Sequence, residues 1–140
     1  MLKTNHPAYK TWMSARDFAK IGAMINQKGI WKGKRIVSEE WISESTTPYH
    51  KFNEDDMNWP KDSYGYLWAI DTKRKNIWGT GYGGQMVMID TTNNLTLVQR
   101  HYTGNSILSQ GLYLRKNTQS SQYDLMKVWE TLVRNKPIEN

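Results

Sequence analysis

The sequence predicts an α+β fold in which an antiparallel sheet of about three strands is flanked by helices. Residues 14–29 and 120–135 have the apolar spacing of amphipathic helices. Between them, residues 64–71, 85–90 and 95–102 have the composition of strands. The short polar turn "TTNN" joins the last two strands, which favours an antiparallel meander. Amphipathic helices packed on such a sheet form an α+β layer.

The first helix, "SARDFAKIGAMINQKG", carries signals at both ends. Ser14 is placed to cap its start, with Asp17 at the reciprocal position, and Gly29 supplies a left-handed stop. One face of this helix is apolar and consists of Phe18, Ile21, Met24 and Ile25.

The next segments are short. Residues 29–37, "GIWKGKRIV", predict a tight turn with extended arms, and Ser38 caps a short helix, "SEEWISES", that ends before Pro48. Residues 49–63 are polar and aperiodic, which predicts a loop.

The strand at 85–90 is apolar on both faces and is therefore expected to be central, while residues 72–84 connect the first strand to it. Residues 103–119 give no clear pattern, although "ILSQGLYL" could form an extended segment. In the last helix, Ser121 and Asp124 mimic a capping box. Its expected buried face consists of Leu125, Val128, Trp129 and Leu132.

Composition limits the function classes. Residues 1–140 suit one segment with a real core, and no apolar run of about 18 residues predicts a membrane span. The N-terminus lacks the apolar block of a signal peptide, and the compartment is left unknown. Cysteine is absent and the three histidines are far apart, so neither a metal site nor a cofactor is expected. The cations behind the net charge of +6 are scattered, which argues against nucleic-acid binding.

The segment "GTGYGGQ", residues 79–85, holds four glycines in seven positions beside the strand at 85–90. Such a cluster indicates either a sharp bend that lets two strands pack closely or a backbone edge that another molecule approaches. A phosphate-binding loop is the weaker interpretation, because these glycines precede a strand and a phosphate loop precedes a helix.

Four segments in order, "WMSARDFAKIG", "NQKGIWKGKRIVSEEWISEST", "YGYLWAID" and "GTGYGGQMVMIDTTNNLTLVQ", carry a family likeness. Together they resemble the C-terminal portion of the bacterial serine β-lactamase and penicillin-binding-protein family, and most of all its class C β-lactamase, esterase and amide-hydrolase branch. The resemblance covers residues 12–102 and the last helix. It implies part of a β-lactamase/transpeptidase-like fold, in a family that is often periplasmic or attached to the cell envelope.

In that family a serine nucleophile lies in S-x-x-K, a second motif is Y-x-N or S-x-N, and a K-T-G-like segment edges the site on a strand. The resemblance places Gly79, Thr80 and Gly81 at the K-T-G position and makes the backbone N–H of Tyr82 an oxyanion donor. One such donor is worth about 3 kcal/mol. Because Gly79 replaces the usual Lys or His, an ester or amide is expected as substrate in preference to a β-lactam or a peptide carboxylate.

The same edge is expected to continue into a substrate-binding segment of Gly83, Gly84 and Gln85. The aromatic segment "YGYLW" adds Tyr64 and Trp68 as candidates for the wall of a substrate cleft. The alternative for these two aromatic residues is a place in the core.

The remaining catalytic motifs of the family are missing from the chain. No serine is followed by lysine three residues later, and no tyrosine or serine is followed by asparagine at the second position. The N-terminal catalytic part is therefore expected to be absent. Two hypotheses follow: a hydrolase segment that is inactive alone, or a non-catalytic binding or interaction module. The expected partners are the N-terminal part of the same hydrolase or a second copy, through an exposed sheet edge.

Overall fold

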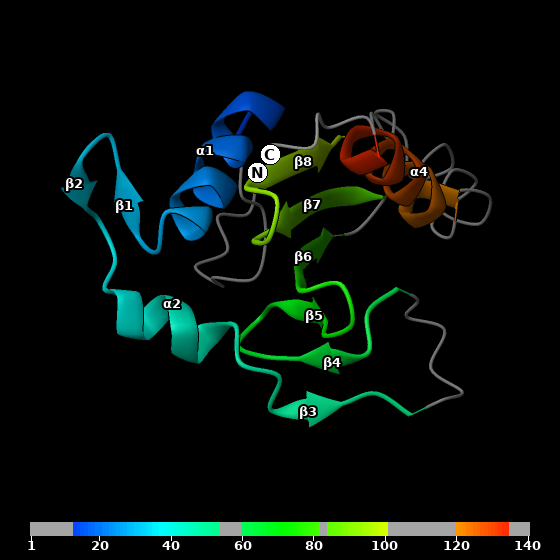
Figure 1. Cartoon of the computed structure of the whole chain (residues 1–140), viewed down its shortest axis with the longest axis horizontal. Helices are drawn as coiled ribbons and strands as arrows, with labels where there is room; N and C mark the ends of the chain where they lie inside the picture. Colours follow the sequence, from blue (N-terminus) through cyan, green and yellow to red (C-terminus); the bar gives the residue numbers. More distant parts are fainter. Residues whose placement is uncertain (1–12, 54–59, 82–83, 101–119, 135–140) are drawn as a thin grey trace, which may run out of the picture.

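The computed structural model describes residues 13–53, 60–81, 84–100 and 120–134 (Figure 1). These residues form three helices, a separate two-stranded hairpin and a six-stranded antiparallel sheet with strand order β3-β4-β5-β6-β7-β8. The predicted α+β class is confirmed. The expected count of about three strands was too low, because the strands at His50–Lys51 and Asn76–Gly81 were not expected and residues 64–71 contribute to two strands instead of one.

The elements follow one another from an N-terminal helix to a C-terminal helix. Their bounds are α1 Ala15–Asn26, β1 Ile30–Trp31, β2 Lys34–Arg35, α2 Glu39–Ser45, β3 His50–Lys51, β4 Ser63–Tyr64, β5 Ala69–Asp71, β6 Asn76–Gly81, β7 Gln85–Asp90, β8 Leu95–Gln99 and α4 Ser120–Arg134.

The first helix, α1, begins and ends as its sequence predicts. The Ser14 side chain accepts a hydrogen bond from the backbone N–H of Asp17, at 3.1 Å, and donates one to the Asp17 carboxylate. At the other end Gly29 adopts a φ of 87° and donates its N–H to the Met24 carbonyl. Both caps satisfy backbone groups that a helix end leaves unpaired.

The short elements after α1 also agree with the sequence. Strands β1 and β2 pair around a turn at Lys32 and Gly33, both of which have positive φ, as a two-residue hairpin turn requires. Ser38 caps α2 by accepting the N–H of Trp41 at 3.0 Å, and α2 ends before Pro48.

The prediction of one strand over residues 64–71 was wrong, because the segment forms the hairpin β4–β5. The N–H of Gly65 donates to the carbonyl of Trp68 and closes the turn. A Cβ on Gly65 would lie 2.5 Å from the carbonyl oxygen of Ser45, so only glycine lets this turn pass under the end of α2. The segment "YGYLWAID" has the composition of a single strand, and its sequence gives no sign of the contact between Gly65 and Ser45.

Two segments expected to be a loop or a connection contain strands. Residues 49–63 hold β3, which pairs with β4, and residues 72–84 hold β6. Both are hard to recognise from sequence, since β3 has two residues and β6 ends in glycines. Strand β7 lies between β6 and β8, which confirms its expected central place.

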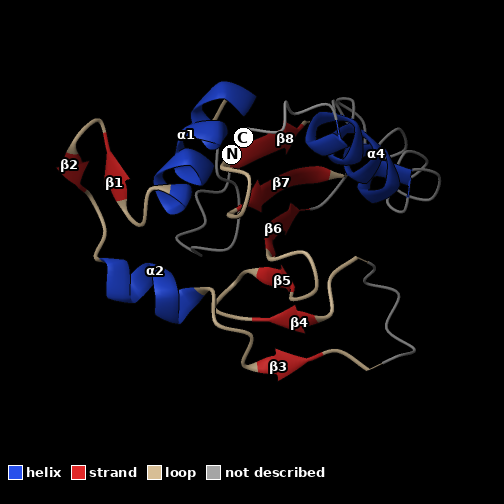
Figure 2. Ribbon diagram, viewed as in Figure 1, coloured by secondary structure: helices blue, strands red, loops and turns tan. Residues whose placement is uncertain are grey.

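Helices α1 and α4 lie on opposite sides of the sheet (Figures 1 and 2). On the α1 side, Ile25 packs with Ile70, Ile77, Val87 and Ile89. On the α4 side, the buried cluster consists of Ala69, Trp78, Met86, Met88, Leu125 and Met126. Successive residues of β6 and β7 alternate between these clusters, so the sheet is buried on both faces along its centre.

The expected buried face of α4 was partly wrong. Leu125 and Met126 are buried, whereas Val128 and Leu132 are 50% and 43% exposed. The helix is held in this rotation by Trp129, whose indole N–H donates to the Asp90 carboxylate at 2.6 Å. The hydroxyl of Ser121 lies outside the described side chains, so the predicted capping box stays a prediction.

Two buried carboxylates close the turns at one end of the sheet. Asp71 accepts from the backbone N–H and the guanidinium of Arg74, each at 3.0 Å. Asp90 accepts from the backbone N–H groups of Thr92 and Asn93, each at 2.9 Å. Both oxygens of each carboxylate therefore accept structural hydrogen bonds.

The residues expected to be unclear, 103–119, lie outside the described part of the chain. Among the helices that are described, none has the length and apolar character needed to cross a membrane.

Gly22 fixes how closely α1 approaches the sheet. A Cβ at this position would lie 2.3 Å from Cγ2 of Thr96 and 3.2 Å from Cγ1 of Ile89. Contacts this short force a shift of the helix or of β8, which is the usual cost of overpacking a core.

We expect Gly22→Ala to lower the free energy of unfolding by about 1–3 kcal/mol, although alanine is the better helix former. The double variant Gly22→Ala with Thr96→Ala should recover more than half of that loss, because Thr96→Ala removes the clashing atoms. Urea denaturation followed by circular dichroism measures all four corners of this cycle. Additive losses in the double variant would contradict the proposed contact.

Candidate functional site

The candidate site lies at the end of β6, where the strand loses one of its two neighbours. Strand β5 pairs with β6 only as far as Trp78. On the other side β7 continues along the strand and pairs Gly79 with Val87, Thr80 with Met86 and Gly81 with Gln85. Within the described ranges, the β5 side of Gly79–Gly81 therefore has no strand beside it.

The glycines of this segment have different structural causes. A Cβ on Gly79 would lie 2.9 Å from Cγ1 of Val87 and 3.1 Å from the ring of Trp68, so the packing of the fold requires glycine there. Gly84 has a φ of 76° in the turn between β6 and β7, a conformation that favours glycine.

Gly81 is the exception, because the described residues give no reason for a glycine there. Its φ lies outside the left-handed region, and an added Cβ would meet only Gln85, at 3.5 Å, an ordinary contact. The residue is also exposed. A molecule that approaches the backbone at Gly81 would explain the missing side chain.

Tyr82 and Gly83 lie outside the described residues, so the predicted oxyanion donor itself stays a prediction. The neighbouring Thr80 is exposed, and its partner Met86 belongs to the cluster under α4. Since directly paired residues point to the same face, Thr80 lies on the α4 side while Gly79 and Gly81 lie on the α1 side.

The two aromatic candidates occupy different places. Trp68 packs against Gly79 and joins the cluster under α1, so it adjoins the site and is also part of the core. Tyr64 pairs with Ala69 on the α4 side of the sheet, and its ring lies 6.1 Å from the ring of Phe52. The structure therefore brings Trp68 to the glycine edge, and Tyr64 lies two strands away.

The pairing of β8 with β7 places Arg100 near the candidate site, although the sequence analysis did not identify this residue. Gln99 pairs with Met86, so Arg100 follows at the level of Gln85 and Gly81. Its guanidinium lies 4.7 Å from the centre of the Phe18 ring, and its buried Nε has no hydrogen-bond partner among the described residues. An arginine at a strand end carries no local signal, and only the strand pairing places it here.

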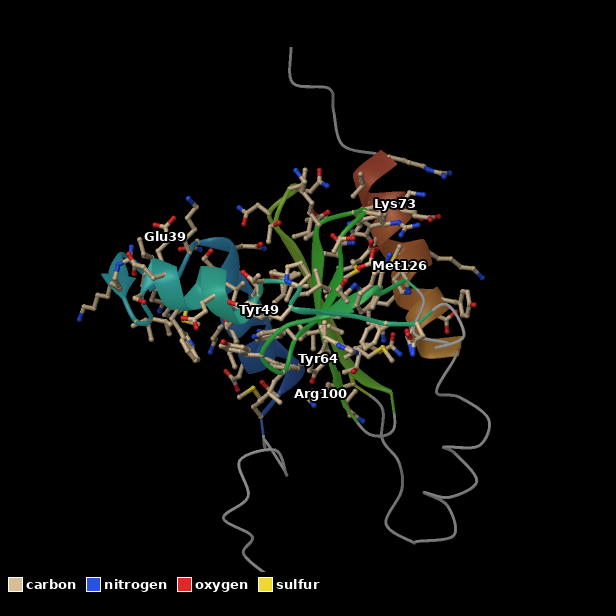
Figure 3. All side chains as sticks on the ribbon, turned by 90° about the horizontal axis from the view of Figure 1, so that it is seen from below. Glu39, Tyr49, Tyr64, Lys73, Arg100 and Met126 are labelled. Atoms are coloured by element: carbon tan, nitrogen blue, oxygen red, sulfur yellow. The ribbon has the colours of Figure 1, made fainter. Side chains whose placement is uncertain are left out.

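Figure 3 shows the two ends of the sheet. Tyr64 and Arg100 lie towards one end of the strands, and Lys73, in the turn after β5, lies towards the other. The glycine edge shares the end of Arg100, whereas the Asp71 and Asp90 turns lie at the end of Lys73.

Three of the described serines have structural hydrogen bonds at helix ends. Ser14 and Ser38 accept backbone N–H groups as helix caps, and Ser45 donates to the carbonyl of Ile42. A hydroxyl needs a neighbouring base before it attacks a carbonyl efficiently. As for metals, the described side chains include no group of three or more His, Asp or Glu residues that could hold an ion.

No family model matches the chain. Over 91 residues it is 28% identical to a 6-aminohexanoate-dimer hydrolase of Paenarthrobacter ureafaciens. The matched region covers 61% of this chain but spans only 23% of the length of that relative. This distant similarity supports a relationship to hydrolases of the β-lactamase fold, and it does not distinguish the class C branch from the others.

Proposed function

We propose that the chain is the C-terminal part of a serine hydrolase of the esterase or amidase type, related to class C β-lactamases. In this proposal residues 79–82 supply the oxyanion edge, and Trp68, Gly83, Gly84 and Gln85 supply part of the wall of the substrate cleft. The similarity to a hydrolase that is named for a dimer of 6-aminohexanoate supports this chemistry.

The open side of Gly81 carries the proposal. The fold accounts for Gly79 and Gly84 but leaves Gly81 without a structural cause. The backbone beside it is also free of a neighbouring strand within the described ranges. A substrate carbonyl could lie against this edge and accept the N–H of Tyr82 as negative charge develops on its oxygen.

The nucleophile and its base would come from another part of the protein. Residues 1–140 contain no S-x-x-K, and Ser14, Ser38 and Ser45 are engaged at helix ends. An oxyanion edge stabilises a tetrahedral intermediate but cannot form or break an acyl bond. The chain alone is therefore proposed to be inactive.

The partner would join the sheet at β8. Among the described strands β8 has a neighbour only on the β7 side, and an open strand edge is a template for pairing. We propose that strands from the remaining part of the hydrolase lie beside Leu95–Gln99. In their absence, a second copy of this chain would compete for the same edge.

The alternative is a non-catalytic interaction module, and one observation favours it. Trp41, Tyr49 and Tyr66 are 51%, 57% and 45% exposed. Their rings are in contact, with centroids 5.9 Å apart for Trp41 and Tyr66 and 5.2 Å apart for Tyr49 and Tyr66. Exposed apolar groups gathered in this way are typical of interaction surfaces.

Sequencing the genomic DNA upstream of the coding region discriminates between the hydrolase hypothesis and the interaction-module hypothesis. An S-x-x-K motif in frame, or in an adjacent reading frame of matching family, supports the hydrolase. Its absence supports the interaction module and counts against the proposal.

We expect the purified chain to show no hydrolysis of nitrocefin, p-nitrophenyl esters or 6-aminohexanoate dimer above a heat-denatured control. A fluorophosphonate probe should leave it unlabelled, because residues 1–140 contain no S-x-x-K serine. Turnover that survives repurification and disappears when one serine is changed would contradict this expectation.

We expect the chain alone to associate through β8, so that its sedimentation coefficient rises with protein concentration. Addition of the missing part of the hydrolase should replace this self-association with a complex of one copy of each. A monodisperse monomer at high concentration, with no binding of a dye for apolar surface, would show that the edge is already closed.

Substitutions at Gly79 and Gly81 provide a matched comparison between a glycine required by packing and a glycine proposed to be required by function. Gly79→Ala should lower the free energy of unfolding by about 1–3 kcal/mol because of its contacts with Val87 and Trp68. Gly81→Ala should leave stability within about 0.5 kcal/mol. In the reconstituted hydrolase, Gly81→Val should reduce kcat while urea denaturation stays unchanged. Full activity in Gly81→Val would show that nothing approaches this edge.

A further inference from the structure

Arg100, directly after β8, carries a half-buried guanidinium that no described carboxylate neutralises. Its Nε is a buried atom and has no hydrogen-bond partner among the described residues. None of the ion pairs found in the described part of the chain includes Arg100. A buried donor without an acceptor is unfavourable, and more so when it belongs to a charged group. The guanidinium therefore lacks an acceptor that the described residues do not supply.

The segments of the sequence next to Arg100 do not supply a carboxylate either. No Asp or Glu occurs between Asp90 and Asp124, and none precedes Asp17. Asp17 adjoins the helix residue that Arg100 contacts, but its carboxylate is paired with Lys20 at 2.6 Å. Asp90 pairs with the first residue of β8, whereas Arg100 follows the last, so the two lie at opposite ends of the strand.

The acidic residues 54–56 also belong to the far end of the sheet, since they follow Phe52 in the chain. The backbone N–H of Phe52 donates to the carbonyl of Asp62. The strand register places Asp62 level with Asp90 and Leu95, away from Arg100. An acceptor from another molecule is therefore the natural partner of this guanidinium.

The ring of Phe18 positions the guanidinium without satisfying its donors. The guanidinium carbon lies 4.7 Å from the centre of that ring. A ring face attracts a cation, but a guanidinium still presents N–H donors in a planar fork that matches the two oxygens of a carboxylate. Because the ring already restrains the side chain, less conformational freedom is lost when an anion binds.

Arg100 faces the same side of the sheet as the candidate oxyanion edge. Val98 belongs to the cluster under α1, and side chains alternate along a strand, so Arg100 also points to the α1 side. Gly81 pairs with Gln85, and the register of β7 with β8 places Gln85 level with Arg100 (Figure 3 labels Arg100). Neighbouring strands lie about 4.8 Å apart, so about 10 Å separates the backbone at Gly81 from that at Arg100.

We propose that Arg100 binds a carboxylate of the substrate, and that the substrate is an ester or amide whose carboxylate lies about 10 Å from the scissile carbonyl. This inference rests on the proposed function and names its substrate class. An extended chain advances about 1.2 Å per bond, so about eight bonds separate the two groups. Gly79 brings no charge to the edge itself, so the cation that selects the substrate lies two strands away.

The first arm of the test needs only the purified chain, with arginine labelled with ¹⁵N. The probe is azelaic acid monoamide, which has an amide carbonyl and a carboxylate at the proposed separation. It should shift the Nε–H signal of Arg100 in a saturable way, because the carboxylate accepts this N–H. Arg74, which is already paired with Asp71, should keep its signal.

Matched controls separate carboxylate binding from a general effect of the probe. Azelaic diamide has the same length without the charge and should leave the Arg100 signal unchanged. Arg100→Gln identifies the signal by its loss. Arg100→Lys keeps the charge but loses the planar fork, and it should weaken binding of the monoamide about tenfold, measured from the other signals that shift.

The second arm uses the reconstituted hydrolase and p-nitrophenyl monoesters of azelaic, adipic and succinic acid, each beside its neutral methyl ester. The ratio of kcat/KM for the charged ester to that for the neutral ester should be about tenfold or more for azelate and near one for succinate. The preference should reside in KM, because Arg100 binds a group remote from the reacting bond. Arg100→Gln should remove the azelate preference. Arg134→Gln makes the same charge change at the exposed end of α4 and should preserve it.

The inference is overturned if the monoamide leaves the Arg100 signal in place, or if the diamide shifts it equally. It is also overturned if Arg100→Gln lowers kcat/KM for the charged and neutral azelate esters by the same factor, which a purely structural role against Phe18 predicts. A shift by the monoamide together with no hydrolysis of any ester would contradict the proposed function while supporting carboxylate binding by Arg100.

Discussion

The rest of the structure depends on the burial of β7 on both of its faces. Val87, Met88 and Ile89 are each at most 1% exposed, and neighbouring residues along the strand point to opposite sides. A strand of this kind is stable only if an apolar layer covers each side of the sheet. Helix α1 supplies one layer and α4 the other. Helices from the two ends of the described chain therefore pack on opposite faces of β7.

This constraint also positions the candidate edge. Trp78 is fully buried in the α4 cluster, and Gly79 is packed between Val87 and Trp68 on the α1 side. Beyond that point β6 leaves β5 and continues along β7 alone. Within the described residues, Gly81 therefore ends β6 with a neighbouring strand on one side only.

The sequence predicted what local chemistry determines. The caps at Ser14 and Ser38, the stop at Gly29 and the central place of β7 follow from residues close to one another in the chain. The hairpin β4–β5 was missed because the glycine at position 65 is required by a close contact with Ser45 at the end of α2, about twenty residues away in the chain. The rotation of α4 was likewise missed because Trp129 binds Asp90 on another element, which leaves Val128 exposed.

For the candidate site, the sequence predicted the glycine segment at residues 79–85. The structure then distinguished which of its described glycines the fold requires. Among the described glycines of this segment, Gly79 follows from packing and Gly84 from backbone conformation, whereas Gly81 has neither cause. Composition cannot make that distinction, because it depends on which side chains lie beside each glycine. Arg100 was missed for a similar reason, since strand register alone brings it level with Gly81.

The central claim is that the backbone N–H of Tyr82, and not its phenol, stabilises the oxyanion. The most direct test compares kcat of the reconstituted hydrolase in two variants at this position. Tyr82→Pro removes the N–H and should reduce kcat about 100-fold or more, with circular dichroism unchanged, whereas Tyr82→Phe keeps the N–H and should cost little. Equal losses in the two variants would show that the phenol is the working group, which would contradict the account.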